Sequence, residues 1–138
     1  MPVTERVQST VITTGPMVES TAPRRTSIPL GNVLLSNVAL YIPNGHAGLT
    51  GFQVQWNDVV IVPWELAGGI LVGTKWVQGN DHDFTFPVGV EVTKNLTVLT
   101  YNSDVLNHSH YIRFTYTPIS LVSKVATIAA IPISTGAQ

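Results

Sequence analysis

The stretch of residues 41–56 constrains the fold of this chain more than any other. An apolar segment runs into Pro43, and a loop with Gly45, Gly48 and Gly51 follows before hydrophobic and polar residues begin to alternate. Proline removes a donor from a strand ladder and closes the strand, whereas glycines let the backbone adopt a positive φ or approach another segment closely. The stretch therefore predicts a strand–loop–strand corner of a β-sandwich.

Further short β-type segments, separated by turn residues, fill the chain from residue 31 to residue 118. The expected strands and strand-containing segments cover residues 32–42, 52–56, 59–63, 64–73, 75–77, 84–92, 96–101 and 110–117. We expect a bulge near Ser36 and Asn37, a break near Pro87 and Gly89, and one wet face on residues 52–56. A helical turn is allowed at residues 65–72 alone.

About eight short strands without a convincing helix predict an all-β protein with one β-sandwich domain at residues 31–118. Alternation of side chains does not fix the order of the strands. The sandwich is therefore expected to be of jelly-roll or Ig-like type, and both remain open at this point.

The two ends of the chain differ from this middle part. Residues 1–30 are rich in Thr, Ser, Val and Pro, and residues 119–138 are apolar but poor in aromatic residues. We expect both to be extended arms, the second with some strand character. The first is either a loose tail or an arm that adds a strand to a neighbouring subunit.

Charged residues are scarce, at 11% of the 138 residues against about a quarter in an average domain. Hydrophobic residues make up 44%, which is enough for a core and leaves few charges for the surface. Such a balance favours a protein that covers part of its surface with partners, so we expect a homo-oligomer or a component of an assembly.

Several classes of function are disfavoured. The formal net charge of -1 and the single basic pair Arg24–Arg25 offer no patch for nucleic acid. The chain has no Cys, and its N-terminus lacks the pattern of a secretory signal. We find no apolar run of the ~20 residues that a spanning helix needs, so no membrane partner is expected.

Histidines are the strongest candidates for chemistry. His82 lies between two aspartates, and His108 and His110 are two residues apart, so that they share one face of a strand. They allow a cupin-like metalloenzyme as a minor hypothesis, although the carboxylate that cupins place after such a pair is missing. We favour a structural role, in which His108 and His110 satisfy backbone groups and His46 donates to a carbonyl and fixes the glycine loop.

Two other chemistries were weighed. Glycoside cleavage needs paired carboxylates, and the available ones look like solvated loop residues: Asp58, Glu65, Asp81, Asp83, Glu91 and Asp104. Trp56, Trp64 and Trp76 offer a sugar-stacking platform, but core or interface anchors explain them more simply. No catalytic, cofactor or metal residue is therefore assigned, and a carbohydrate-binding β-sandwich module remains the alternative function.

The glycine loop of residues 42–51, together with the segments 83–86, 101–104 and 110–114, resembles small all-β virion proteins of tailed bacteriophages. The resemblance covers roughly residues 31–117, a length suited to one sandwich domain. It implies a structural protein of the capsid surface, a vertex or spike, or the neck, made in the host cytoplasm and located in the virion. It also implies contacts with itself and with other virion proteins, such as major capsid or portal proteins, and no enzymatic activity.

Overall fold

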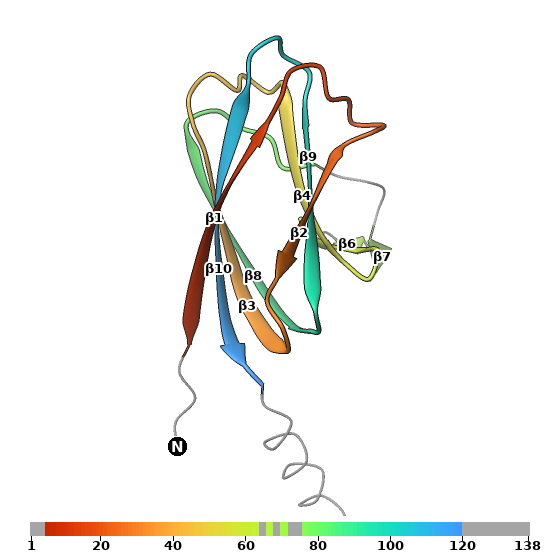
Figure 1. Cartoon of the computed structure of the whole chain (residues 1–138), viewed down its shortest axis with the longest axis vertical. Helices are drawn as coiled ribbons and strands as arrows, with labels where there is room; N and C mark the ends of the chain where they lie inside the picture. Colours follow the sequence, from red (N-terminus) through yellow and green to blue (C-terminus); the bar gives the residue numbers. More distant parts are fainter. Residues whose placement is uncertain (1–4, 64–65, 68–69, 72–75, 120–138) are drawn as a thin grey trace, which may run out of the picture.

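A computed structural model describes residues 5–63, 66–67, 70–71 and 76–119 and shows two antiparallel sheets packed face to face (Figure 1). Sheet A has the order β1 (Arg6–Thr14), β10 (His108–Pro118), β3 (Val33–Ile42) and β8 (His82–Val92). Sheet B has the order β2 (Arg24–Pro29), β9 (Asn95–Asn102), β4 (Thr50–Trp56) and β5 (Val59–Val62). The short strands β6 (Leu66–Ala67) and β7 (Ile70–Leu71) pair with each other.

Successive strands alternate between the two sheets, so that β1, β3, β8 and β10 enter one sheet and β2, β4, β5 and β9 the other. Within these sheets only β4 and β5 are both consecutive and paired. This alternation is the connectivity of a jelly roll, whereas Ig-like sandwiches pair several consecutive strands within a sheet. The predicted all-β sandwich is confirmed, and its topology is that of a jelly roll.

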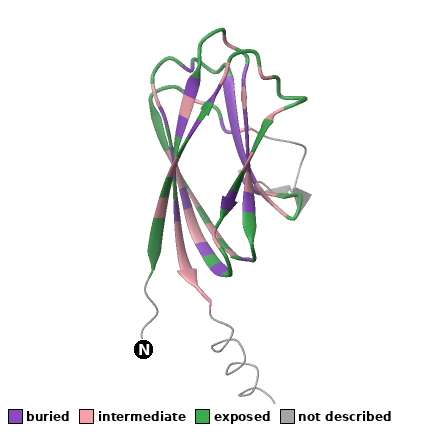
Figure 2. Ribbon diagram, viewed as in Figure 1, coloured by how far each residue is buried: buried purple, intermediate pink, exposed green. Residues whose placement is uncertain are grey.

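The core lies between the two sheets, where every second side chain of each strand points (Figure 2). The largest fully buried apolar side chains are Phe52, Phe114, Leu35, Leu40, Ile42 and Leu96. Each side chain of this size stabilises the fold by about 1.5–3 kcal/mol relative to exposure. The β-branched and aromatic residues that predicted the strands therefore also supply the force that holds the sheets together.

The expectation that residues 1–30 form an extended arm is wrong, because two strands of the sandwich lie within this range. β1 pairs with β10 along its whole length, β2 pairs with β9, and both contribute a buried isoleucine, Ile12 and Ile28, to the core. The prolines that suggested an arm lie in the connection or at the end of β2, where a missing donor costs little. Residues 1–4 lie outside the described part, as does the expected C-terminal arm beyond Ile119.

Details of individual strands agree in part with expectation. The bulge near Ser36 is present as a register shift between β3 and β8, and β8 continues through the expected break because Gly89 takes a φ of 85° there. The expectation that one face of β4 is exposed to solvent is wrong, since Gln53 is 1% exposed. It lies opposite the buried Leu99, and its side-chain oxygen accepts a hydrogen bond from Gln55 at 2.8 Å.

Residues 66–67 and 70–71 are short strands, in agreement with the strand-containing connection expected at residues 64–73. These described residues do not form the helical turn that residues 65–72 would allow. Of the expected strand at residues 75–77, Val77 forms an isolated bridge with Phe52, and Lys75 lies outside the described residues. No helix of the described residues is long and apolar enough to cross a membrane.

Gly51→Ala tests the packing at the start of β4. A Cβ there would overlap the ring of Tyr101, which is held by Trp76 at a centroid distance of 4.9 Å and by Gln78. We expect the free energy of unfolding in urea to fall by about 1–3 kcal/mol. Gly15→Ala is the matched control, since its Cβ would meet nothing closer than 3.9 Å. Equal losses in the two variants would contradict this packing.

Candidate assembly interface

One end of the sandwich gathers three connections between the sheets, at the top of Figure 1. They are residues 15–23 between β1 and β2, residues 43–49 between β3 and β4, and residues 103–107 between β9 and β10. We call these connections together the loop end. Loops positioned by a rigid sandwich are common places for binding residues, so the groups that fix these loops decide what the end can do.

Asn102 joins two of the loops. Its side chain is fully buried, and its amide nitrogen donates to the carbonyls of Thr14, Gly15 and Leu106 at 3.1, 3.1 and 2.7 Å. Its side-chain oxygen accepts from the backbone N–H of Asp104 at 3.0 Å. Backbone bonds reinforce this junction, because the Met17 N–H donates to the Asp104 carbonyl and Val18 forms a bridge with Asn102.

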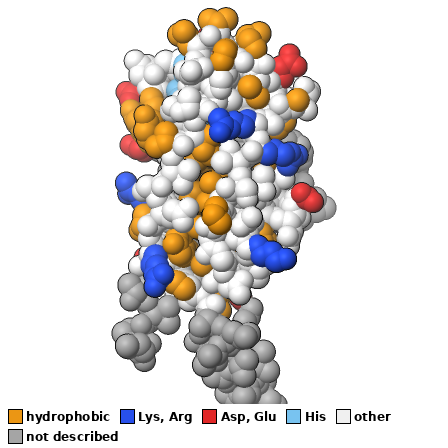
Figure 3. Space-filling view, in the orientation of Figure 1, with side chains coloured by type: hydrophobic (Ala, Val, Ile, Leu, Met, Phe, Trp, Pro, Cys, Tyr) orange, Lys and Arg blue, Asp and Glu red, His pale blue; other side chains and the backbone are white. Residues whose placement is uncertain are grey.

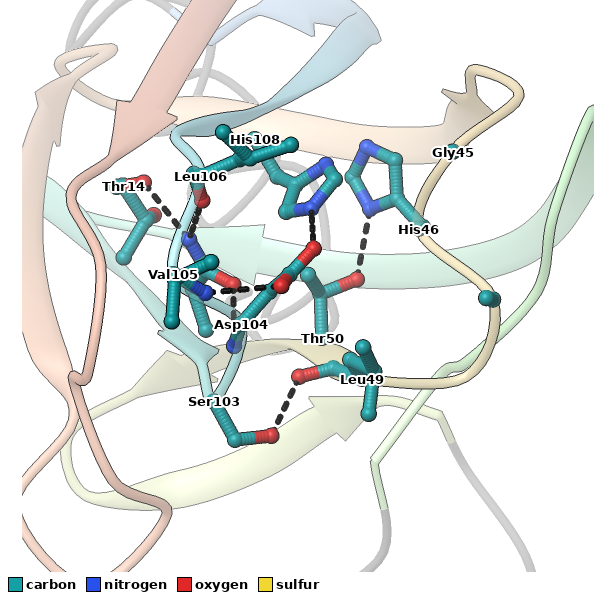
Figure 4. A network of polar contacts seen from close by, with 12 residues as sticks. Thr14, Gly45, His46, Leu49, Thr50, Ser103, Asp104, Val105, Leu106 and His108 are labelled. Atoms are coloured by element: carbon teal, nitrogen blue, oxygen red, sulfur yellow. Dashed lines mark hydrogen bonds and ion pairs between the residues drawn. The ribbon is translucent and has the colours of Figure 1, made fainter.

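The glycine loop is attached by its own set of bonds. The side-chain oxygen of Asn80 accepts from the N–H groups of Gly45 and Ala47, at 2.8 and 3.0 Å. The hydroxyl of Ser103 donates to the carbonyl of Leu49 at 2.8 Å, which links this loop to the β9–β10 connection (Figure 4). All three loops are therefore tied to one another by side chains as well as by the backbone.

His46 closes the glycine loop from inside. Its Nε2 lies 3.0 Å from the carbonyl oxygen of Ser109, which can only accept, so Nε2 carries the proton. Its Nδ1 lies 2.6 Å from the Thr50 hydroxyl and accepts from it. Burial lowers the pKa of His46, and the nearby imidazole of His108 lowers it further. The expectation that His46 donates to a carbonyl and fixes the loop is confirmed.

His108 and Asp104 form a hydrogen bond beside this histidine, with Nε2 and Oδ2 2.8 Å apart (Figure 4). The hydrogen bond from His108 lowers the pKa of the Asp104 carboxyl, and backbone donors of the same loop add to the effect. The ring of His108 also packs on that of His46, at a centroid distance of 4.5 Å. The pair therefore ties the first residue of β10 to the tip of its preceding loop.

His110 differs from the other two histidines of this cluster. It is fully buried, and neither ring nitrogen has a hydrogen-bond partner. Its ring lies 5.0 Å from that of His46 and 5.8 Å from that of Phe52, measured between centroids. Burial lowers the pKa of His110 to about 3, with smaller effects from His46 and His108. The expectation that His110 satisfies a backbone group is wrong.

The minor hypothesis of a metal site formed by His82, His108 and His110 is not supported, because the three side chains do not come together. His82 is exposed on β8 and packs on Phe84, at a centroid distance of 4.5 Å, while His46 takes the third place in the cluster. Both nitrogens of His46 are already bonded. Within the described ranges, no group of three His, Cys, Asp or Glu residues is placed to hold a metal ion.

The other sequence candidates are also dispersed. Trp56 and Trp76 are half-buried, and Trp76 packs near the first residues of β4 whereas Trp56 is the last, about 17 Å along the strand. Trp64 and Glu65 lie outside the described residues. Among the acidic candidates, Asp104 is bonded to His108 and Asp81 accepts from the Tyr41 hydroxyl at 3.0 Å. A tryptophan platform is therefore not formed by the two that are described.

The loop end presents apolar side chains to solvent. Val105 is 73% exposed, Leu106 and Met17 are each 64% exposed, and Leu49 is 40% exposed. Hydrophobic side chains gather at this end of the molecule in the space-filling view (Figure 3). No local sequence pattern indicates this surface, because the three loops lie far apart along the chain and meet only in the fold.

Comparisons with known proteins bear on the fold. No protein-family model matches the sequence, and no curated protein matches it. One similar solved structure is a chain of the cyanophage Pam1 capsid asymmetric unit, with 13% identity, a TM-score of 0.53, and coverage of 85% of this chain and 86% of that chain. A crystal structure of PirA gives 17% identity, a TM-score of 0.44, and coverage of 77% and 92%, which is too weak to carry an argument.

The capsid chain is therefore similar to this protein in fold, over most of both lengths. It shows that the same kind of all-β sandwich occurs in a phage capsid. A sequence identity of 13% supports a shared fold alone, so the function is argued from the loop end.

Asn102→Asp tests the junction of the loops. The substitution keeps the shape but replaces a donor by a carboxylate that faces three carbonyls, so we expect a loss of at least about 2 kcal/mol in the free energy of unfolding. Asn95→Asp, exposed at the start of the same strand, is the control and should change stability by less than about 0.5 kcal/mol. Urea unfolding at neutral pH measures both. A small effect of Asn102→Asp would mean that the amide does not hold the loops.

Stability should fall as the solution is acidified. The unfolded chain protonates His110 below pH 6.5, whereas the folded chain resists protonation to about pH 3, so the free energy of unfolding decreases across that window. At pH 4.5 the loss from His110 is about 2–3 kcal/mol relative to pH 7. The lowered pKa of His46 acts in the same direction, and that of Asp104 adds to the loss below its ordinary value of 3.8.

His110→Phe should remove a large part of this acid sensitivity, since an aromatic ring replaces two unpaired nitrogens beside Phe52. The measurement is the free energy of unfolding at pH 7 and pH 4.5 in urea. His82→Phe, at an exposed position of β8, should keep the wild-type difference. An unchanged difference in His110→Phe would show that His110 has a partner or is protonated in the folded chain.

Proposed function

We propose that this chain is a structural component of a bacteriophage particle and acts by protein–protein assembly through its loop end. The observation that carries the proposal is the set of exposed apolar side chains on loops that a buried polar network holds in place. Loops ordered before binding lose little conformational entropy on docking, so apolar contacts at their tips convert more fully into affinity.

The fold supports the same role. A jelly roll is an architecture of capsid proteins, lectins and cupins, and the similar chain comes from a cyanophage capsid asymmetric unit. The scarcity of charge, at 11% of residues, also suits a protein that is partly covered in an assembly. The proposed role needs no enzymatic activity, no cofactor and no nucleic acid, and places the chain in the virion after synthesis in the host cytoplasm.

The finer role is a protein that decorates the capsid, forms part of a vertex or spike, or sits in the neck. Its partners are then the major capsid or portal and neck proteins, with further copies of the same chain. A carbohydrate-binding module is the less favoured function, because Trp56 is the last residue of β4 whereas Trp76 packs on Tyr101 beside the start of that strand.

The test replaces the exposed tips of the β9–β10 loop. Val105→Asp together with Leu106→Asp should leave the fold intact, since both side chains are exposed, and should weaken binding to particles that lack the chain by at least about tenfold. Co-sedimentation of the purified chain with such particles measures the binding. Val59→Asp is the control, because Val59 is 50% exposed on β5 and pairs with Trp56, the last residue of β4 and far from the loop end. Undiminished binding of the double variant would refute docking through the loop end.

A further inference from the structure

The outer face of sheet A carries an organised row of side chains that the loop end does not use. Strand pairing sets Val11, Tyr111, Tyr41 and Asp83 side by side across all four strands. The next outward row is formed by Ser9, Arg113, Ala39 and Thr85 in the same way. A shallow groove of about 390 Å³ lies over these two rows. The face thus carries two tyrosines at its centre, a cation near them on the central strand β10 and an anion on the edge strand β8.

The centre consists of two tyrosines on neighbouring strands. Tyr111 is 46% exposed and Tyr41 is 37% exposed, and their ring centroids are 6.2 Å apart. The hydroxyl of Tyr41 donates to Asp81 at 3.0 Å, and this bond holds the ring in place and raises the pKa of Tyr41. Val11, which is 56% exposed, extends the apolar area onto β1. Tyrosine and arginine are the residue types that dominate the energetics of protein interfaces.

Two opposite charges lie beside this centre. Arg113 lies on β10, two residues from Tyr111, and Asp83 lies on β8 in the row of the tyrosines, so two strand spacings and two residues along the sheet separate them by about 12 Å. Both are exposed, and neither forms a salt bridge with any residue of the described ranges. One face therefore holds, at diagonal positions beside an aromatic pair, a cation and an anion without a salt bridge among the described residues.

We propose that two copies of the chain pack face to face through the outer surface of sheet A. A twofold axis lies in the plane of the contact and passes between Arg113 and Asp83. Rotation about this axis sets Arg113 of each copy against Asp83 of the other copy. Such a contact is isologous, so both charge pairs form at once around the tyrosines. Because of this symmetry, the face is complementary to the same face of a second copy.

The size of the face agrees with this occupant. Four strands at a spacing of about 4.8 Å, each with 9–11 residues of about 3.4 Å, cover roughly 600 Å² in projection. Stable interfaces bury about 800 Å² of accessible surface per partner, and a surface of side chains exceeds its flat projection. The face lies on the side of the sandwich and the loop end at its tip, so both contacts can form together (Figure 1). The dimer adds a contact between copies of the chain to the proposed assembly role, and its relevance in a particle rests on that proposed function.

Charge reversal tests the pairing in solution. Sedimentation velocity of the full chain, from about 1 µM to about 300 µM, should show a reversible dimer. Arg113→Glu and Asp83→Arg should each raise the dissociation constant by at least about tenfold, since each sets like charges together twice. The double variant with both substitutions should regain the dimer, because the two charges are exchanged. Arg25→Glu, an exposed reversal on β2 of the other sheet, should leave the dissociation constant unchanged.

Two results would overturn the inference. One is a monomer over the whole concentration range; the other is a dimer that neither single reversal weakens. A monomer that binds neutral oligosaccharides on an array, and loses that binding in Tyr111→Ser, would assign the groove to a saccharide instead. Failure here is separate from failure of the proposed function: monomers that bind particles through the loop end refute the pairing alone, and dimers that bind no particle refute the particle role.

Discussion

The loop end depends on one buried amide. Asn102 supplies donors to carbonyls of the β1–β2 and β9–β10 connections, and it accepts from the turn that begins the second of them. A buried polar side chain with all its groups bonded fixes a unique arrangement, whereas an unbonded one costs stability. The positions of Met17, Val105 and Leu106 follow from this amide, since their loops have little core of their own.

A histidine cluster lies directly beneath these loops and sets a limit on their stability. His46 is fully bonded and His108 is paired with Asp104, but His110 is buried with two free nitrogens. The apolar core of the two sheets offsets this cost at neutral pH, where the imidazole is uncharged. Burial lowers the pKa of both His46 and His110, so protonation of either ring in acid destabilises the folded chain beneath the loop end.

Sequence patterns predicted the class of fold because they depend on local physics. Alternating hydrophobic and polar residues and the bulge near Ser36 are both encoded within a few residues. The jelly-roll order was beyond such patterns, since β1 pairs with β10 across about a hundred residues of chain. For the same reason residues 6–29 were expected in an arm: a strand at a sheet edge and a loose β-type tail have the same local composition.

The candidate site was predictable only in its parts. The role of His46 followed from a histidine in a tight glycine loop, but its contact with His108 and His110 required the β3–β10 pairing. His82 was grouped with the wrong histidines, because spacing along the chain does not say which side chains point into the core. His82 pairs with Ile42 near the loop end but is exposed on the edge strand β8. The role of Asn102 and the apolar loop tips left no sequence signal, since each depends on carbonyls or side chains from several loops.

Docking of the rigid sandwich in a phage particle through its loop end is the proposal on which the other assembly contacts depend. It can be observed in a cryo-electron microscopy map of particles from the phage proposed to encode this chain, at a resolution that shows side chains. We expect density for the sandwich on the particle, with Met17, Val105 and Leu106 buried against another virion protein. Particles without the chain, or a bound chain whose loop end faces solvent, would contradict it.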